Sequence, residues 1–219
     1  MIKTFIALLF ITTITINTHS QSPDVTKARD ILDKVSAQTQ KYGTIRADFT
    51  FTLENLQAEM TDTYEGSIVM KGEKFMVDVM GANTYFDGET VWTYMTEINE
   101  VNISDKEMLE EEGGLNPGTV FTIYEEGFNY IYDGEGIIRG RTVDIVDLFP
   151  EERDQPYSRI KLYIYRDDLQ FAQIKQIGKD GTNYIIEVED MVVDGDDVDD
   201  SYFTFNPDDY PDIVVIDLR

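Results

Sequence analysis

Apolar side chains recur at a helical period directly after residue 22. From Val25 to Tyr42 they lie three or four positions apart, and charged residues fill the positions between them. The preceding residues 22–24 (Ser-Pro-Asp) form a helix-start signal, and Gly43 supplies a stop. This pattern predicts one amphipathic helix of about five turns whose apolar stripe lies over an apolar surface.

The period of the pattern changes to two after Gly43. Phe49, Phe51 and Leu53 alternate with polar side chains, which is typical of a strand with one buried face. Glycine- and asparagine-containing turns separate further strand-like segments: 61–70, 74–80, 83–86, 90–95, 100–104, 130–132, 137–149, 159–165, 171–177, 183–193 and 202–205. An acidic helical turn over 105–112 and a short apolar helix over 117–124 interrupt this series.

The order of these elements predicts an α+β fold. About ten or eleven antiparallel strands form one curled sheet, an unclosed barrel lidded by the N-terminal helix and a short mid-chain helical insert. No repeat and no low-complexity linker divides the chain. We therefore expect a single domain over residues 21–219.

Residues 1–20 have the layout of a secretory signal peptide. A charged start is followed by an apolar run over residues 5–16 and a short polar end, with Thr18 and Ser20 at the small-residue positions before the cut. We expect cleavage after Ser20 and a periplasmic product. An uncleaved anchor is the alternative, although the apolar run is short for a membrane span.

Composition excludes several function classes. The chain has no cysteine, and its one histidine, His19, lies in the predicted signal peptide. A disulfide scaffold, a thiolate metal site and a His-dependent triad are therefore excluded from the mature chain. With 18 basic and 43 acidic residues, the net charge is −25, which argues against nucleic-acid binding. We expect no cofactor, and a monomer.

Acidic residues are too widespread to mark a catalytic pair. A secreted hydrolase using two carboxylates stays open as a hypothesis, but the large apolar inner face argues against it. Residues 194–200 (Asp-Gly-Asp-Asp-Val-Asp-Asp) resemble a calcium loop in composition only. They lack the spacing and the twelfth-position glutamate, so a solvated loop is favoured over a calcium site.

The predicted inner face of the sheet is large and apolar. Alternation and size select Phe49, Phe51, Leu53, Ile68, Met70, Phe75, Val77, Val79, Tyr85, Trp92 and Tyr94, and the mid-chain insert adds Phe121. A filled core and a lipid cavity use the same residue types, and composition alone favours the filled core. The volume that they enclose decides between the two, and periodicity does not supply it.

The strand series resembles a known family in its motifs and their spacing. The matching stretches are residues 47–51 (Ala-Asp-Phe-Thr-Phe), 66–71 (Gly-Ser-Ile-Val-Met-Lys), 74–75 (Lys-Phe), 85–94 (Tyr-Phe-Asp-Gly-Glu-Thr-Val-Trp-Thr-Tyr) and 100–101 (Glu-Val). This series is similar to LolA, the periplasmic outer-membrane lipoprotein carrier. The most specific part is the Asp-Gly-x-x-Val-Trp-x-Tyr hairpin after a Gly-x-Ile strand, and the resemblance spans residues 25–130.

The resemblance implies a function and partners. It implies a non-enzymatic chaperone that holds lipoprotein acyl chains in an apolar cavity lined by the inner-face residues named above. The carrier would receive acylated lipoproteins from an inner-membrane lipoprotein-releasing ABC complex and deliver them to an outer-membrane acceptor. The alternative is a periplasmic module with the same half-barrel that senses lipid or lipoprotein and regulates a membrane partner.

One departure from the family concerns the lid. The family commonly carries an arginine just after the Gly-x-Ile strand, and in well-known members this arginine latches the lid. Here the stretch is 71–74 (Lys-Gly-Glu-Lys). A lysine cannot copy the planar five-donor guanidinium, so neither Lys71 nor Lys74 is assigned the latch, and the closing mechanism stays open.

Overall fold

The structure is a computed structural model that describes residues 23–106, 108, 127–195 and 198–219. The predicted signal peptide, the predicted helix over 117–124 and Phe121 lie outside these residues. The elements are α1 (Pro23–Thr39), β1 (Ile45–Asn55), β2 (Met60–Lys71), β3 (Lys74–Val79), β4 (Ala82–Phe86), β5 (Thr90–Met95), β6 (Glu100–Asp105), β7 (Phe128–Ile138), β8 (Arg141–Pro150), β9 (Tyr157–Tyr165), β10 (Phe171–Gly178), β11 (Thr182–Val193), η1 (Asp200–Phe203), η2 (Pro207–Asp209) and β12 (Val214–Asp217).

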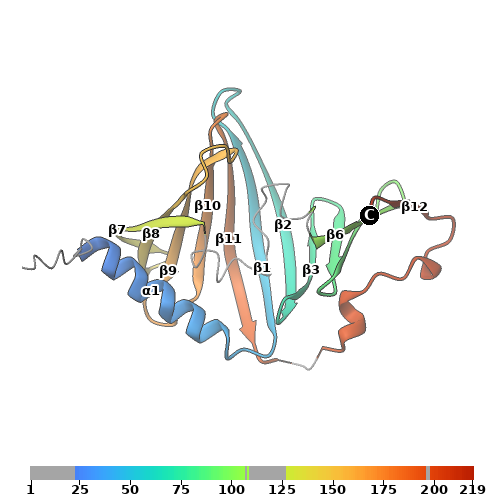
Figure 1. Ribbon diagram of the computed structural model, residues 1–219, viewed down its shortest axis with the longest axis horizontal. Coiled ribbons are helices and arrows are strands. Elements are labelled where there is room, and N and C mark those ends of the chain that lie inside the picture. Colours follow the sequence, from blue (N-terminus) through green and yellow to red (C-terminus); the bar gives the residue numbers. More distant parts are fainter. Residues whose placement is uncertain (1–22, 107, 109–126, 196–197) are drawn as a thin grey trace, which may run out of the picture.

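All twelve strands form one open sheet. Their order is β12-β6-β5-β4-β3-β2-β1-β11-β10-β9-β8-β7, and every neighbouring pair is antiparallel except β12 with β6. Strand β1 pairs with β11, and this pairing joins strands β1 to β6 and strands β7 to β11 into one sheet (Figure 1). The predicted unclosed antiparallel half-barrel with an N-terminal helix is confirmed.

Helix α1 covers the inner face of the sheet over β7 to β10 (Figure 1). Ala28, Leu32 and Val35 on its apolar stripe are at most 1% exposed, and they pack with a buried cluster from these strands. Polar contacts flank the apolar stripe near Ala28: Lys27 Nζ lies 3.6 Å from the centre of the Tyr132 ring, and Arg29 Nε donates to the Tyr130 hydroxyl at 2.8 Å. The helix thus lies where its apolar stripe predicted.

A C-terminal strap, residues 198–213, covers the outer face of β2 to β6 (Figure 1). Phe203, fully buried, packs on Val69, while the rings of Phe205 and Tyr210 pack on Tyr94 at a tilt, with centroids 5.2 and 4.7 Å away. The strap therefore gives this half of the sheet a second hydrophobic core, on the face opposite α1.

Lys71 and Lys74, which lie in the stretch where the family commonly has an arginine, bind the strap. Lys71 Nζ donates to the carbonyl of Val198 at 2.8 Å and pairs with Asp200 at 3.0 Å, and Lys74 Nζ pairs with the same carboxylate at 2.8 Å. Gly72 between them has φ +61°, so an arginine there would strain the turn. This turn therefore anchors the outer-face strap.

Three predictions about strands were wrong. Residues 137–149 form two strands, because Arg139 and Gly140 adopt positive φ and turn the chain between β7 and β8. Residues 202–205 were expected as a strand, but a 3₁₀ turn, η1, begins at Asp200 and ends at Phe203, capped by Asp199. The edge strand β12 was not predicted, because its four residues follow a proline- and aspartate-rich segment that resembles a loop.

Replacing Asp200 with asparagine should weaken the strap in a pH-dependent way. Hydrogen bonds from Lys74 and then Lys71 hold the pKa of Asp200 below its ordinary value of 3.8. A carboxylate with a lowered folded-state pKa stabilises above its unfolded pKa and loses that effect as the pH falls through the folded pKa. Thermal melts should show wild type above Asp200→Asn at pH 7, with the gap closing towards about pH 2. A gap that is the same at both pH values would contradict this role.

Candidate functional site

The inner face of β1 is positioned by simple alternation and by one β-bulge. Ile45, Ala47, Phe49 and Phe51 face inwards along β1, as the two-residue period predicted. On β11 the register shifts opposite Asp48 and Phe49, so that Val188 pairs with Phe49 and Met191 pairs with Ala47. The bulge keeps both Val188 and Met191 on the inner face although they are an odd number of residues apart.

Strands β1, β2, β3, β10 and β11 line an apolar cavity of about 240 Å³. Its described lining comprises Ile45, Ala47, Phe49, Phe51, Ile68, Met70, Val77, Val79, Phe171, Ile174, Ile186, Val188 and Met191, from β1, β2, β3, β10 and β11. Every one of these described residues has an apolar side chain. Since one water requires only about 15 Å³ of such volume, the space is far larger than a packing defect.

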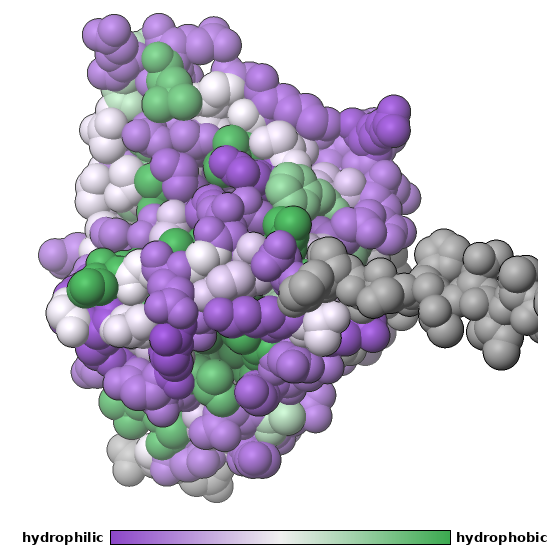
Figure 2. All heavy atoms as spheres, turned by 90° about the vertical axis from the view of Figure 1, so that its left-hand side faces the viewer, coloured by the Kyte–Doolittle hydropathy of each residue, from purple (hydrophilic) through white to green (hydrophobic). Residues whose placement is uncertain are grey.

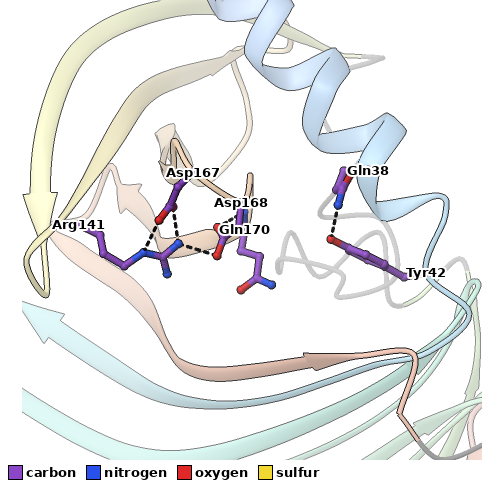
Figure 3. Close-up of polar contacts among 6 residues, drawn as sticks. All are labelled: Gln38, Tyr42, Arg141, Asp167, Asp168 and Gln170. Atoms are coloured by element: carbon purple, nitrogen blue, oxygen red, sulfur yellow. Dashed lines mark hydrogen bonds and ion pairs between the residues drawn. The ribbon is translucent and has the colours of Figure 1, made fainter.

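The cavity lies beside the part of the sheet that α1 covers. Phe171 and Ile174 belong both to the helix-packed cluster and to the cavity lining. On the other side of the cavity lies a second buried cluster on the inner face, formed by Ile45, Met70, Phe75, Phe86 and Val91. Tyr42, on the segment between α1 and β1, packs on this cluster, and Gln38 of α1 donates to the Tyr42 hydroxyl at 2.9 Å (Figure 3). On the side of the molecule that carries β7 and the start of α1, the exterior is largely hydrophilic (Figure 2).

The family model for the outer membrane lipoprotein carrier protein LolA matches residues 16–143. The chain belongs to the LolA family. No curated protein sequence matches it. Members of this family are binding or carrier proteins, and membership supports a periplasmic lipid- or lipoprotein-binding module here. None of the helices in the described ranges has the length and apolarity needed to cross a membrane.

One solved structure shares the fold of this chain at low sequence identity, and others superpose less closely. An uncharacterised conserved protein from Thermus thermophilus superposes with a TM-score of 0.55 at 14% identity, covering 87% of this chain and 99% of its own. LprF from Mycobacterium bovis gives 0.47 at 15% identity, covering 84% and 98%. A LolA superfamily protein from Nitrosomonas europaea gives 0.45 at 12% identity, covering 81% and 97%.

The structure brings together half of the inner-face residues that the sequence of this LolA-family chain predicted. Those in the cavity lining are Phe49, Phe51, Ile68, Met70, Val77 and Val79. Phe75 lies in the adjoining cluster, where it is 1% exposed and its ring centroid is 5.3 Å from that of Phe86. Leu53 is further along β1, outside the lining, and Phe121 lies outside the described residues.

Three predicted lining residues lie on the opposite face. In the β3–β4 hairpin Val79 pairs with Ala82 and Val77 with Thr84, so the even-numbered residues of β4 face inwards. Tyr85 and its partner Trp92 therefore face outwards, as does Tyr94, and all three pack with Phe205 and Tyr210 of the strap. The prediction selected these aromatics by size, but the inner positions are the alternate ones: Ala82, Thr84 and Phe86 on β4, and Val91, Thr93 and Met95 on β5.

The prediction missed the wall that β10 and β11 contribute. This wall consists of Phe171, Ile174, Ile186, Val188 and Met191. The alternation in residues 184–188 was a usable signal, since Ile186 and Val188 flank Glu187. The pairing of β11 with β1, which brings this wall beside the others, joins segments far apart in the sequence.

Charged groups are excluded from the described cavity lining and gather elsewhere. Asp48, Glu65, Asp78 and Glu189 line a polar hollow on the outer face, behind the lining strands. Arg141 on β8 pairs with Asp167 and Asp168 in the β9–β10 turn (Figure 3). The lining thus offers an apolar ligand contact surface, with no general acid, base or nucleophile among its described residues.

One buried carboxylate lies under α1. Asp144 is 7% exposed and accepts hydrogen bonds from Arg166 and from the Tyr132 hydroxyl. Burial alone would raise its pKa, but the hydrogen bonds from Arg166 and then Tyr132 hold the pKa below its ordinary value. Asp144 is therefore a structural anion that orients Tyr132 beneath Lys27 of the helix.

Acidic residues near 194–200 act as caps in the described structure. Asp194 accepts a hydrogen bond from the Gly43 amide at 2.5 Å, and Asp199 accepts one from the Ser201 amide at 2.9 Å. Asp196 and Asp197 lie outside the described residues. Within the described ranges, no three Asp, Glu or His side chains converge as a metal site.

Proposed function

We propose that this protein binds the acyl chains of lipoproteins in its inner-face cavity and carries lipoproteins through the periplasm. The observation that carries the proposal is the cavity itself, whose described lining is entirely apolar and forms part of the inner face of the sheet. An apolar space of this kind binds ligands by removing hydrocarbon from water.

The energetics of an acyl chain fit a carrier. Burying hydrocarbon gains about 0.8 kcal/mol per CH₂, so a sixteen-carbon chain gains roughly 12 kcal/mol. Such a chain leaves a membrane only for a site of comparable apolarity. The negative exterior, with a net charge of −25, is repelled by anionic lipid surfaces, which favours a protein that stays in solution between encounters.

The proposed cycle involves two membranes. An inner-membrane lipoprotein-releasing ABC complex would supply the acylated lipoprotein, and an outer-membrane acceptor would receive it. The proposed mature protein is one domain over residues 21–219, exported to the periplasm by cleavage after Ser20. Its action is binding and release, with the energy supplied by its partners.

A fluorescent sixteen-carbon fatty acid should bind to the purified mature chain and be displaced by a triacylated lipoprotein. Its emission should rise on entering the cavity, because the probe leaves water. Mass spectrometry of the organic extract of the protein should detect copurified acyl lipids. Failure of the lipoprotein to displace the probe would contradict the proposed cargo.

A transfer assay separates the carrier from the sensing alternative, which uses the same cavity. Inner-membrane vesicles containing a labelled lipoprotein are mixed with the protein, and the soluble complex is then offered to outer-membrane vesicles. A carrier should move label between the two vesicle populations in proportion to its concentration. Binding of lipoprotein without any transfer would favour the sensing module.

A further inference from the structure

Strand β12 ends one side of the sheet with its outer edge unpaired by any described strand. The Val214 amide donates to the Asn99 carbonyl at 3.0 Å, and the Leu218 amide donates to the Ile103 carbonyl at 2.8 Å. Because backbone groups of successive strand residues point to opposite sides, Val215 and Asp217 direct their amides and carbonyls away from β6. These groups form a row that another strand can pair with.

Apolar side chains accompany this edge on both faces. Val214 is 51% exposed, Val215 46%, Ile216 37% and Leu218 50%. Proteins usually protect such an edge with lysine, proline or a bulge. The strand has neither a lysine nor a proline, and its pairing with β6 runs without a register shift. Although β12 is short, its edge is therefore suited to accept a further strand.

The charge around β12 selects the kind of partner. Among the described residues, Asp212 precedes β12, Asp217 belongs to it, and Glu100 and Asp105 lie on the paired strand β6. Arg219, which follows β12 closely, pairs with Asp217 at 2.7 Å, so its positive charge is already balanced by a carboxylate. A second copy would bring the same carboxylates to the edge, and like charges would oppose its approach. A basic partner is attracted instead.

We propose that β12 is a docking edge that accepts an extended segment of a partner protein in which apolar residues alternate with lysine or arginine. The partner's backbone would pair with Val215 and Asp217, its apolar side chains would cover Ile216 and its neighbours, and its cations would face the aspartates. In strand addition the main chain supplies affinity and the alternate side chains supply specificity. The edge lies on β12, whereas the cavity is lined by β1, β2, β3, β10 and β11, so docking leaves the cavity free.

A synthetic nine-residue peptide that alternates valine and lysine is the probe for this edge. Its binding to the full mature chain is measured by fluorescence anisotropy at physiological salt. The control peptide has the same sequence with alternating L and D residues, so it keeps charge and composition but cannot form an ordinary strand. We expect the control to bind at least tenfold more weakly. Equal binding by the two peptides would show electrostatic adsorption and overturn the proposal.

Variants of Val215 test the site itself. Val215→Pro removes the outward amide and leaves the amides that face β6, whereas Val215→Thr keeps the amide and the branched shape. Peptide affinity should fall at least tenfold for the proline variant and stay within twofold for the threonine variant. Unchanged peptide affinity in Val215→Pro would overturn the proposal. So would analytical ultracentrifugation that shows a dimer for the wild type and a monomer for Val215→Pro, because the edge would then bind a second copy of this chain.

Hydrogen exchange of backbone amides in the wild-type protein tests the proposal independently, in case the Val215→Pro substitution disturbs β12. In wild-type protein the peptide should slow hydrogen exchange at Val215 and Asp217 at least tenfold, while amides of α1 keep their rates. Protection elsewhere with none at these two amides would place the peptide at another surface and contradict the assignment.

Discussion

Replacing Val77 with aspartate should lower the affinity for a sixteen-carbon acyl probe by about a hundredfold or more. Val77 lines the cavity and pairs with Ile68 on β2 and Thr84 on β4. The variant places a carboxylate among apolar side chains, with no cation in the described lining. An unpaired polar or charged group costs several kcal/mol when a ligand removes its water, and about 2.7 kcal/mol is a hundredfold in affinity.

Probe titrations of two variants with the same added charge test this effect. Thr52→Asp is the matched control, since Thr52 alternates with Phe51 and lies on the outer face, 3.3 Å from the Thr63 hydroxyl. The control should bind the probe as wild type does, and circular dichroism should show both variants folded. A folded Val77→Asp protein with wild-type affinity would mean that acyl chains bind elsewhere.

Replacing Gly66 with alanine should destabilise the fold by about 1–3 kcal/mol, the usual cost of overpacking. A Cβ at this position would lie 2.6 Å from Phe49 Cζ and 2.9 Å from the carbonyl oxygen of Asp78. The ring can shift, but the carbonyl belongs to the β3 backbone and cannot move without bending the strand. Gly66 therefore provides the space in which the Phe49 ring lies against the cavity.

Urea unfolding of two glycine variants measures this cost. Gly195→Ala is the control, because among the described residues its new Cβ would meet only Val192 Cγ1, at an ordinary 3.6 Å, and it should change stability by less than about 0.5 kcal/mol. Adding Phe49→Leu to Gly66→Ala should recover part of the loss, because a smaller side chain relieves the contact. Wild-type stability of Gly66→Ala would show that the backbone accommodates the added methyl group.

The sequence predicted those parts of the site in which apolar and polar residues alternate within one strand. The inner face of β1 was predictable because Phe49 and Phe51 follow a two-residue period in one strand. Beyond the β3–β4 hairpin the face depends on the register, and pairing Val79 with Ala82 turns Trp92 outwards. The residues around 202–205 were apolar enough to predict a strand, but they pack as part of a strap across other strands. Local patterns therefore predicted the elements, whereas long-range pairing set which faces meet.

The cavity lies between two packed clusters of the inner face, the one under α1 and the one that contains Phe75 and Phe86. Most of the lining residues belong to these clusters or pack against them, but Ala47, Phe51 and Val79 do neither, so exchange of one of these three for another apolar residue of similar size leaves the packed regions intact. Met70 and Met191 add adaptable thioether side chains to the lining. Substitutions at Ala47, Phe51 and Val79 can therefore reshape the cavity at little expense to folding, and related chains can diverge there while keeping the same architecture.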